Sequence, residues 1–196
     1  QNSWKKGVFM EAVDKKMLLK NDFLRKENEL YLNFINSGEK IETNKFMCKT
    51  LKEVNEGCAM ITDWVYQKCI EQLNKGKKVG LLGGDHSIAF GFIKALAETH
   101  ENFGILQIDA HCDLRKSYEG LDHSHGSIMY NVLNSFPNVT KLIQLGIRDY
   151  CEAEWNYICD SEFRVITYLE REIRERQFEG STWSQLSDEI INQLPQ

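Results

Sequence analysis

The chain has 196 residues, of which 42% are hydrophobic and 27% are charged. This balance excludes a wholly disordered or collagen-like chain and fits one globular domain. The 24 basic and 29 acidic residues give a formal net charge of -5, so the overall charge gives no reason to expect nucleic acid as a partner.

Two compartment signals are also missing from the sequence. It holds no run of about 18 uncharged apolar residues and no basic leader before an apolar run, so we expect no membrane span and no signal peptide. The six cysteines are scattered and form no C-x-x-C pair, which favours reduced thiols over a disulfide scaffold or a structural zinc site. We therefore expect a cytoplasmic protein.

The N-terminal part of the chain predicts helices. A charged helical pattern runs around Met17 to Phe34, and apolar side chains recur every three or four residues from Leu51 to Cys69. The second pattern is the periodicity of a helix with one buried face. No clear strand is expected in the first 50 or so residues.

From Gly76 onward, short apolar runs alternate with amphipathic stretches. The expected strands are Val79–Gly83, Phe103–Ala110, Lys141–Gly146 and Arg164–Tyr168. The expected helices run from Ser87 toward Leu96, from Ser127 toward Leu133, from Glu152 toward Ile158 and from Ser181 toward Leu194. The mixed charges near Arg171 to Arg176 are interpreted as a solvated surface. This alternation predicts an α/β fold with a parallel sheet covered by helices on both faces.

The densest polar chemistry follows the strand expected at Phe103–Ala110. Asp109, His111 and Asp113 stand two residues apart, so their side chains point to one side if the strand continues that far. Two carboxylates that flank an imidazole repel each other unless a cation compensates their charge. The pattern predicts a divalent metal site, against the simpler interpretation that these residues cap turns and pair with Lys or Arg.

The preceding predicted strand ends in Gly83-Gly84-Asp85-His86-Ser87. Because ligands bind outside the carboxyl ends of parallel strands, we expect His86 to lie beside Asp109. Asp85 and Ser87 are expected to cap the following helix. Two carboxylates with two imidazoles suit Mn²⁺, Co²⁺, Fe²⁺ or Zn²⁺. Asp109 is the candidate bridge between two cations, which would lie about 3.5–4 Å apart and share a hydroxide.

Two more imidazoles occur in the segment Asp122 to Ser127. A loop histidine that faces an activated water can pass a proton to a leaving amine, because its ordinary pKa is near ~6.5. His123 and His125 both fit this role, and each fits an ordinary loop position equally well. His100 ends a predicted helix, where an imidazole interacts favourably with the helix C-terminus.

Three of these motifs resemble those of the ureohydrolases, the family of arginase and agmatinase. GGDHS stands at Gly83–Ser87, DAHxD at Asp109–Asp113 and SHG at Ser124–Gly126, in the family order and with family-like spacing. The resemblance spans roughly Gly76 to Gly146. It implies a three-layer αβα fold with a mainly parallel sheet, the arginase/deacetylase-like fold.

The resemblance also implies a chemistry. It implies two Mn²⁺ ions that activate a bridging hydroxide for attack on a guanidinium carbon, releasing urea and an amine. By motif, His86, Asp109 and Asp113 hold one metal, His111 and Asp109 hold the other, and His125 shuttles a proton. A guanidinium is cationic and resonance-stabilised, so it requires a nucleophile of this strength. His123 has no role in the family pattern.

The substrate is then a small cationic guanidino compound. The residues after the metal motif, Arg115, Tyr118, Glu119 and Gly120, look more like agmatinase-type sequences than like the arginase loop that binds an α-carboxylate. Arginase and formimidoylglutamase are the next candidates, and the agmatinase and arginase activities imply a place in polyamine or arginine metabolism. Family members are commonly trimers or hexamers, so we expect a homo-oligomer.

The sequence departs from the family at its C-terminal end. The family's later D-x-D metal motif and the acidic residue that meets the guanidinium do not occur in these residues. We expect one domain over residues 1–196, truncated after a helix, incomplete at the C-terminus and at the N-terminus, and weak in manganese binding by itself.

Two alternatives are open. One is a deacetylase-type metal amidohydrolase of the same fold with one zinc, against which His86 and Asp113 argue because they provide for a second metal. The other is a catalytically silent scaffold or regulatory member, which the missing D-x-D favours.

Overall fold

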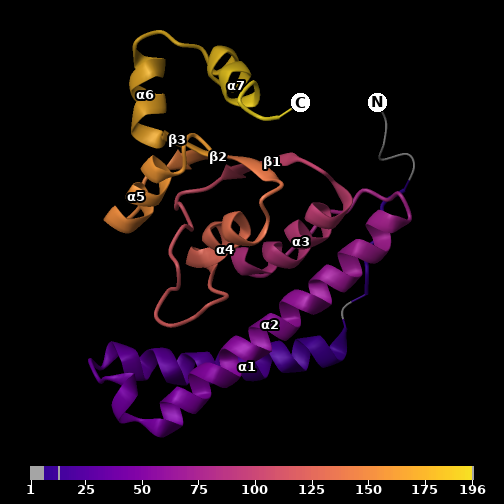
Figure 1. The fold of residues 1–196 in the computed structure, drawn as a ribbon, viewed down its shortest axis with the longest axis vertical. Helices are drawn as coiled ribbons and strands as arrows, with labels where there is room; N and C mark the ends of the chain where they lie inside the picture. Colours follow the sequence, from indigo (N-terminus) through magenta and orange to yellow (C-terminus); the bar gives the residue numbers. More distant parts are fainter. Residues whose placement is uncertain (1–6, 13, 196) are drawn as a thin grey trace. The chain divides into compact units, whose positions relative to one another are not determined.

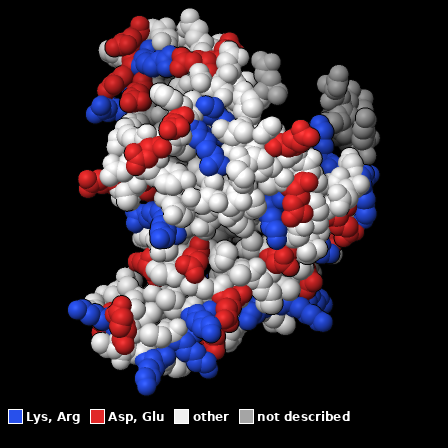
Figure 2. Space-filling model, in the orientation of Figure 1, with Lys and Arg blue, Asp and Glu red and all other residues white. Residues whose placement is uncertain are grey.

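The structure is a computed structural model that describes residues 7–12 and 14–195. The chain divides into two compact units, Gln1–Gly57 and Cys58–Gln196, and each is described by itself. Lys and Arg side chains are interspersed with Asp and Glu over the face drawn in Figure 2. In the part of the chain that the structure describes, no helix combines the length and the apolar character that a membrane crossing requires.

The first unit is helical, as the sequence predicts. It holds α1 (Lys15–Asn36), the short 3-10 helix η2 (Ile41–Thr43) and the first part of α2 (Lys45–Asn74), which continues into the second unit. α1 begins where the Asp14 carboxylate accepts the backbone N–H of Lys16 at 2.8 Å, an ordinary N-cap. A Cβ at Gly57 would lie 2.3 Å from Cδ2 of the buried Leu24. The two helices therefore approach closely at this glycine.

The second unit contains a parallel sheet of three strands, β1 (Phe103–Ile108), β2 (Val139–Ile147) and β3 (Val165–Leu169). The strand order is β1-β2-β3, with β1 at one edge of the described sheet. These strands confirm three of the four strand predictions, with small changes in their ends. β1 stops two residues earlier than expected.

Helices cover both faces of this sheet (Figure 1). α3 (Ala89–Thr99), α4 (Ile128–Ser135) and α5 (Glu152–Asp160) contribute to the main core on one face, together with apolar residues of β2 and β3. α6 (Glu170–Phe178) and α7 (Trp183–Ile191) lie on the other face. Short 3-10 helices, η3 (His86–Ile88) and η4 (His125–Ser127), precede α3 and α4. The predicted α/β architecture with a helical layer on each side is confirmed.

The prediction of a strand at Val79–Gly83 is wrong. No strand forms there, and Leu82 is 88% exposed. An apolar run indicates only that a segment suits a sheet, whereas a strand also needs a neighbour whose N–H and C=O groups pair with its own. Among the described residues, the only strand pairs are β1 with β2 and β2 with β3.

The sequence interpretation also missed α6, because its mixed charges look like a solvated surface. Ile173 is its one buried side chain among the described residues, and ion pairs four residues apart, Arg171 with Glu175 and Arg174 with Glu170, lie along it. Such pairs support a helix that buries little. α7 is shorter than the predicted helix and ends at Ile191.

Candidate metal centre

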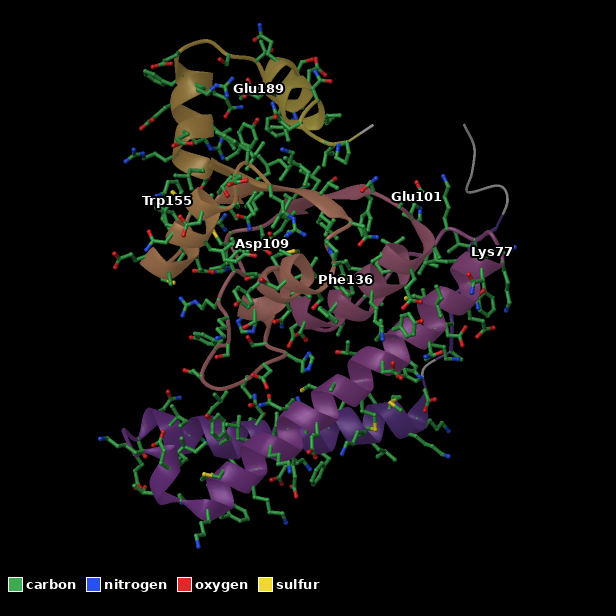
Figure 3. All side chains as sticks on the ribbon, viewed as in Figure 1. Lys77, Glu101, Asp109, Phe136, Trp155 and Glu189 are labelled. Carbon is green, nitrogen blue, oxygen red and sulfur yellow. The ribbon has the colours of Figure 1, made fainter. Side chains whose placement is uncertain are left out.

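The segment Asp109–Asp113 that follows β1 is irregular, and we call it the turn. It keeps some pairing with β2 and its continuation, through the Asp109 N–H to the Leu145 carbonyl and an isolated bridge of His111 with Asp149. β1 ends at Ile108, and Asp113 has a left-handed backbone with φ 55°. The prediction that strand alternation would point Asp109, His111 and Asp113 in one direction is therefore wrong. The turn instead brings the two carboxylates together and leaves the His111 side chain 60% exposed. Figure 3 labels Asp109 at the end of the strand.

Asp109, Asp113 and His86 form a tight cluster. His86 Nδ1 lies 2.6 Å from Asp113 Oδ2 and 3.3 Å from Asp109 Oδ2. One donor atom from each of the three residues lies within 4.8 Å of the other two. The prediction that His86 reaches Asp109 is confirmed, although no strand precedes His86.

The position of His86 is set by the start of η3. The Asp85 carboxylate accepts the Ser87 backbone N–H at 2.9 Å, which confirms Asp85 as a cap. Ser87 does not cap α3, since its hydroxyl donates to Asp85 instead and Ile88 occupies the cap position. His86 is therefore held in the first turn of η3.

Electrostatics in the cluster favour a cation. The hydrogen bond to Asp113 raises the pKa of His86, although burial acts in the opposite direction. Burial alone would raise the pKa of Asp109, but hydrogen bonds from the backbone N–H of His111 and Ala110 and from the Gln107 side chain keep it below its usual value. The Nδ1 atom of His86 therefore lies within 3.3 Å of an oxygen of each carboxylate, an arrangement of donor atoms that a divalent cation can occupy in place of a proton. The donor set fits a metal that accepts oxygen and nitrogen ligands.

His111 lies on the other side of Asp109. Its Nδ1 is 3.7 Å from Asp109 Oδ1, and its Nε2 is 3.8 Å from Oδ2 of Asp149. The structure does not bring His111 into the cluster of three, but it places the two Asp109 oxygens toward different imidazoles. Asp149 was missed by the sequence interpretation. The rule that singled out Asp109, a carboxylate just after an apolar strand, also applies to it.

The two loop histidines have different surroundings. His125 is exposed at the start of η4, with its ring centroid 6.0 Å from that of Tyr118. Burial raises the pKa of Asp113, and the charges of His86 and, less strongly, His125 act against this rise. His123 is half-buried, packs edge-to-face against Phe90 at 6.3 Å, and has its pKa lowered by burial. Of the two, His125 has the electrostatic link to the cluster.

A cleft of about 560 Å³ lies beside the cluster, within the size range of small-molecule sites. Its walls come mainly from apolar residues of α3 and β1, and its polar side chains are those of His86, Gln107 and Asp109. A ligand in this cleft would meet polar groups at the cluster.

Several buried polar residues that support the site were not predicted. Gln107 and Gln144 lie inside apolar strands, and Glu154 lies on α5. All three hydrogen-bond to the backbone of the segment His111 to Leu114. For the two glutamines, the only signal in the sequence is their position inside an apolar run.

Comparison with known proteins gives a consistent family. Residues 27–193 match the Arginase family. An N(1)-aminopropylagmatine ureohydrolase from Synechocystis sp. is 32% identical over 127 residues, which cover 61% of this chain and 40% of that protein. A formimidoylglutamase from Halalkalibacterium halodurans is 42% identical over 74 residues, covering 37% of this chain and 23% of that protein.

The fold comparison agrees with the sequence comparison. The crystal structure of an arginase from Bacillus subtilis aligns with a TM-score of 0.56 and 25% identity, covering 73% of this chain and 51% of that chain. The chain spans less than half the length of the curated relatives it matches. The family match over most of its residues, with the motif positions clustered as described, shows that this chain belongs to the arginase family.

Proposed function

We propose that this chain carries manganese ligands of a ureohydrolase that hydrolyses a guanidino compound to urea and an amine. The observation that supports this most directly is the cluster of His86, Asp109 and Asp113, in which one donor atom of each lies within 4.8 Å of the others. Each of these residues occupies a ligand position of the motifs that resemble the ureohydrolases.

The proposal assigns a role to each site residue. His86, Asp109 and Asp113 would hold one Mn²⁺, and His111 with Asp109 would hold another. Bound manganese supplies a water of lowered pKa and a positive charge beside the substrate. Asp109 is the side chain that can reach both positions, because its two oxygens lie 3.3 Å from His86 and 3.7 Å from His111.

His125 is the proposed proton carrier. Its imidazole is exposed, so it can exchange protons with solvent and with a leaving amine. His123 is less suited to this task, because it packs against Phe90 and burial disfavours its charged form.

The proposed substrate is agmatine or an agmatine derivative, with arginine and formiminoglutamate next. Support comes from two relatives named N(1)-aminopropylagmatine ureohydrolase, which are 32% and 38% identical over their matched residues. The two agmatinases of Halalkalibacterium halodurans and Bacillus anthracis are 33% and 30% identical. The family resemblance also suggests a cytoplasmic homo-oligomer, a trimer or a hexamer, and one α/β domain over residues 1–196.

Manganese titration of the purified chain tests the metal proposal. We expect weak binding that is lost in His86→Ala and weakened less in His111→Ala, because the His111 ring is mostly exposed. His100→Ala is the matched control, since its imidazole contacts the helix end at Leu96 and Thr99 and no site residue. A wild-type chain that binds no Mn²⁺, or a His86→Ala chain that binds as well as wild type, would contradict the assignment.

A substrate panel tests the reaction. Agmatine, aminopropylagmatine and arginine are scored by urea, and formiminoglutamate by formamide, each with and without Mn²⁺. Turnover that prefers agmatine or its derivative and falls in His125→Ala supports the proposal. Turnover with formiminoglutamate alone would assign the chain to the formimidoyl branch of the family.

A further inference from the structure

A row of three polar side chains crosses the sheet beneath the candidate metal centre. Gln107 of β1, Gln144 of β2 and Thr167 of β3 are register partners in the parallel ladders. The Thr167 hydroxyl donates to Gln144 Oε1 at 2.8 Å, and Gln144 Nε2 donates to Gln107 Oε1 at 2.7 Å. We refer to these three residues as the polar row. Gln144 is fully buried and Gln107 is 4% exposed.

The polar row ends on the segment that carries the proposed ligands. Gln107 Nε2 donates to the carbonyl of His111 at 3.2 Å, and the same side chain hydrogen-bonds to the Asp109 carboxylate. Gln144 Nε2 donates to the carbonyl of Cys112 at 2.7 Å. Two consecutive carbonyls of the turn are therefore held by amides from the sheet.

These contacts use the full donor capacity of Gln144. Its two amide hydrogens meet the Gln107 side chain and the Cys112 carbonyl, and its oxygen accepts from Thr167. A buried amide is costly unless each polar atom is paired. Apolar side chains of similar shape can be equally stabilising in such a place. Beyond stability, the polar row fixes the orientation of the His111 and Cys112 carbonyls, because a hydrogen bond constrains the angle between the groups that it joins.

The turn needs this support for a local reason. The regular ladder of β1 ends at Ile108, and pairing continues through the Asp109 N–H to the Leu145 carbonyl, the Ala110 carbonyl and an isolated bridge of His111 with Asp149. Asp113 then adopts a left-handed backbone that non-glycine residues avoid. The carbonyls of His111 and Cys112 follow this irregular pairing, and their hydrogen-bond donors are the side chains of Gln107 and Gln144.

We propose that Gln144 is a positioning residue that, together with Gln107, sets the turn Asp109–Asp113 and the direction of the Asp109 carboxylate toward the metal. The inference rests on the proposed function for the identity of the metal. The effect of Gln144 on the conformation of the turn does not depend on the proposed function. Gln144 touches no proposed ligand side chain, so it acts through the Cys112 carbonyl and through Gln107.

Manganese titration of Gln144→Met, Gln107→Met and the double variant tests this. Residues that orient metal ligands change metal affinity by about 10- to 100-fold, and we expect a loss in this range for each single variant. Because the row passes through Gln107, the double variant should lose much less than the product of the single losses. Ile143→Val is the matched control, since it alters a fully buried neighbour of Gln144 without touching a polar contact. Its affinity should equal that of wild type.

Losses that multiply in the double variant would contradict the link through Gln107, and unchanged affinity in Gln144→Met would overturn the inference. Where Gln144→Met does not fold, Thr167→Val removes only the far hydrogen bond and should weaken Mn²⁺ binding in the same direction by a smaller factor.

Hydrogen exchange of the metal-free chain separates this inference from the proposed function. Peptides that cover residues 109–114 should exchange faster in Gln144→Met than in wild type or Ile143→Val. A wild-type chain that fails to bind Mn²⁺ contradicts the proposed function, and the exchange result still decides the role of the row. Exchange that stays unchanged in Gln144→Met overturns the positioning role whatever the metal result.

Discussion

The carboxylate of Glu154 on α5 accepts the backbone N–H of Leu114, 40 residues earlier in the chain, at 3.1 Å. Its second oxygen accepts the N–H of Cys151 at 3.0 Å, which closes the first turn of α5. The side chain is only 3% exposed. One buried carboxylate therefore ties the start of a helix to the residue that follows the proposed metal motif.

Removal of this carboxylate should destabilise the fold. Glu154→Ala leaves the Leu114 N–H buried without an acceptor, and an unsatisfied buried donor costs about 1–3 kcal/mol. Denaturant unfolding should show a loss of this size in the free energy of unfolding. Glu154→Gln keeps a carbonyl oxygen for one of the two N–H groups and should lose less. Equal losses in the two variants would contradict the role of the hydrogen bond to Leu114.

The left-handed backbone of Asp113 makes a prediction with an unusual sign. Alanine normally stabilises a chain relative to glycine, because glycine has more freedom when unfolded. At φ 55° the order should reverse, and Asp113→Ala should be less stable than Asp113→Gly by about 1 kcal/mol. Both variants lose the carboxylate, so both should lose Mn²⁺ binding. Thermal unfolding of the metal-free variants measures the difference, and an alanine variant at least as stable as the glycine variant would refute it.

Gly91 makes a close helix contact possible within the second unit. A Cβ at this position would lie 2.4 Å from the Thr62 carbonyl oxygen and 2.9 Å from the Tyr66 backbone nitrogen, both in α2. Backbone atoms cannot rotate away, so Gly91→Ala should cost about 1–3 kcal/mol of stability. Gly80→Ala is the control, because nothing lies within 4 Å of its would-be Cβ. A loss of similar size in both variants would mean that the close contact is not the cause.

The cysteines should react in an order set by burial. Cys48 and Cys159 are exposed, whereas Cys69 and Cys112 are buried. Burial also raises the pKa of the Cys69 thiol, which reduces its thiolate fraction at pH 8, and the thiolate is the reactive form. Iodoacetamide at pH 8 should therefore modify Cys48 and Cys159 first, and Cys69 and Cys112 only after unfolding. Peptide mass spectrometry reads the order directly, and early modification of Cys69 would be inconsistent with the described core.

The sequence predicted the elements that a regular pattern of apolar residues marks within their own segment. The helix around Leu51 to Cys69 and the strand at Lys141–Gly146 were predicted because one periodic face, or one apolar run, is enough to identify them. The strand predicted at Val79–Gly83 does not form, because a strand also needs a hydrogen-bonded neighbour, which its own residues do not specify. α6 was missed because Ile173 alone cannot establish a period.

The site shows the same division. The motifs identified Asp109, Asp113 and His86, because carboxylates and imidazoles grouped directly after apolar runs are rare and chemically distinctive. The way in which the two carboxylates meet was not predictable, since it depends on the left-handed turn at Asp113. Gln144 was also invisible, because a glutamine in an apolar run becomes informative only when its partner on the next strand is known.

The polar row also restricts how the three strands can align. A shift of one residue turns every side chain of a strand to the opposite sheet face. Such a shift in β2 would place the Gln144 amide among apolar side chains and would bring Ile143, which is fully buried, opposite Gln107 and Thr167. The incorrect alignment loses several hydrogen bonds at once, so the three residues select a single pairing of the strands during folding.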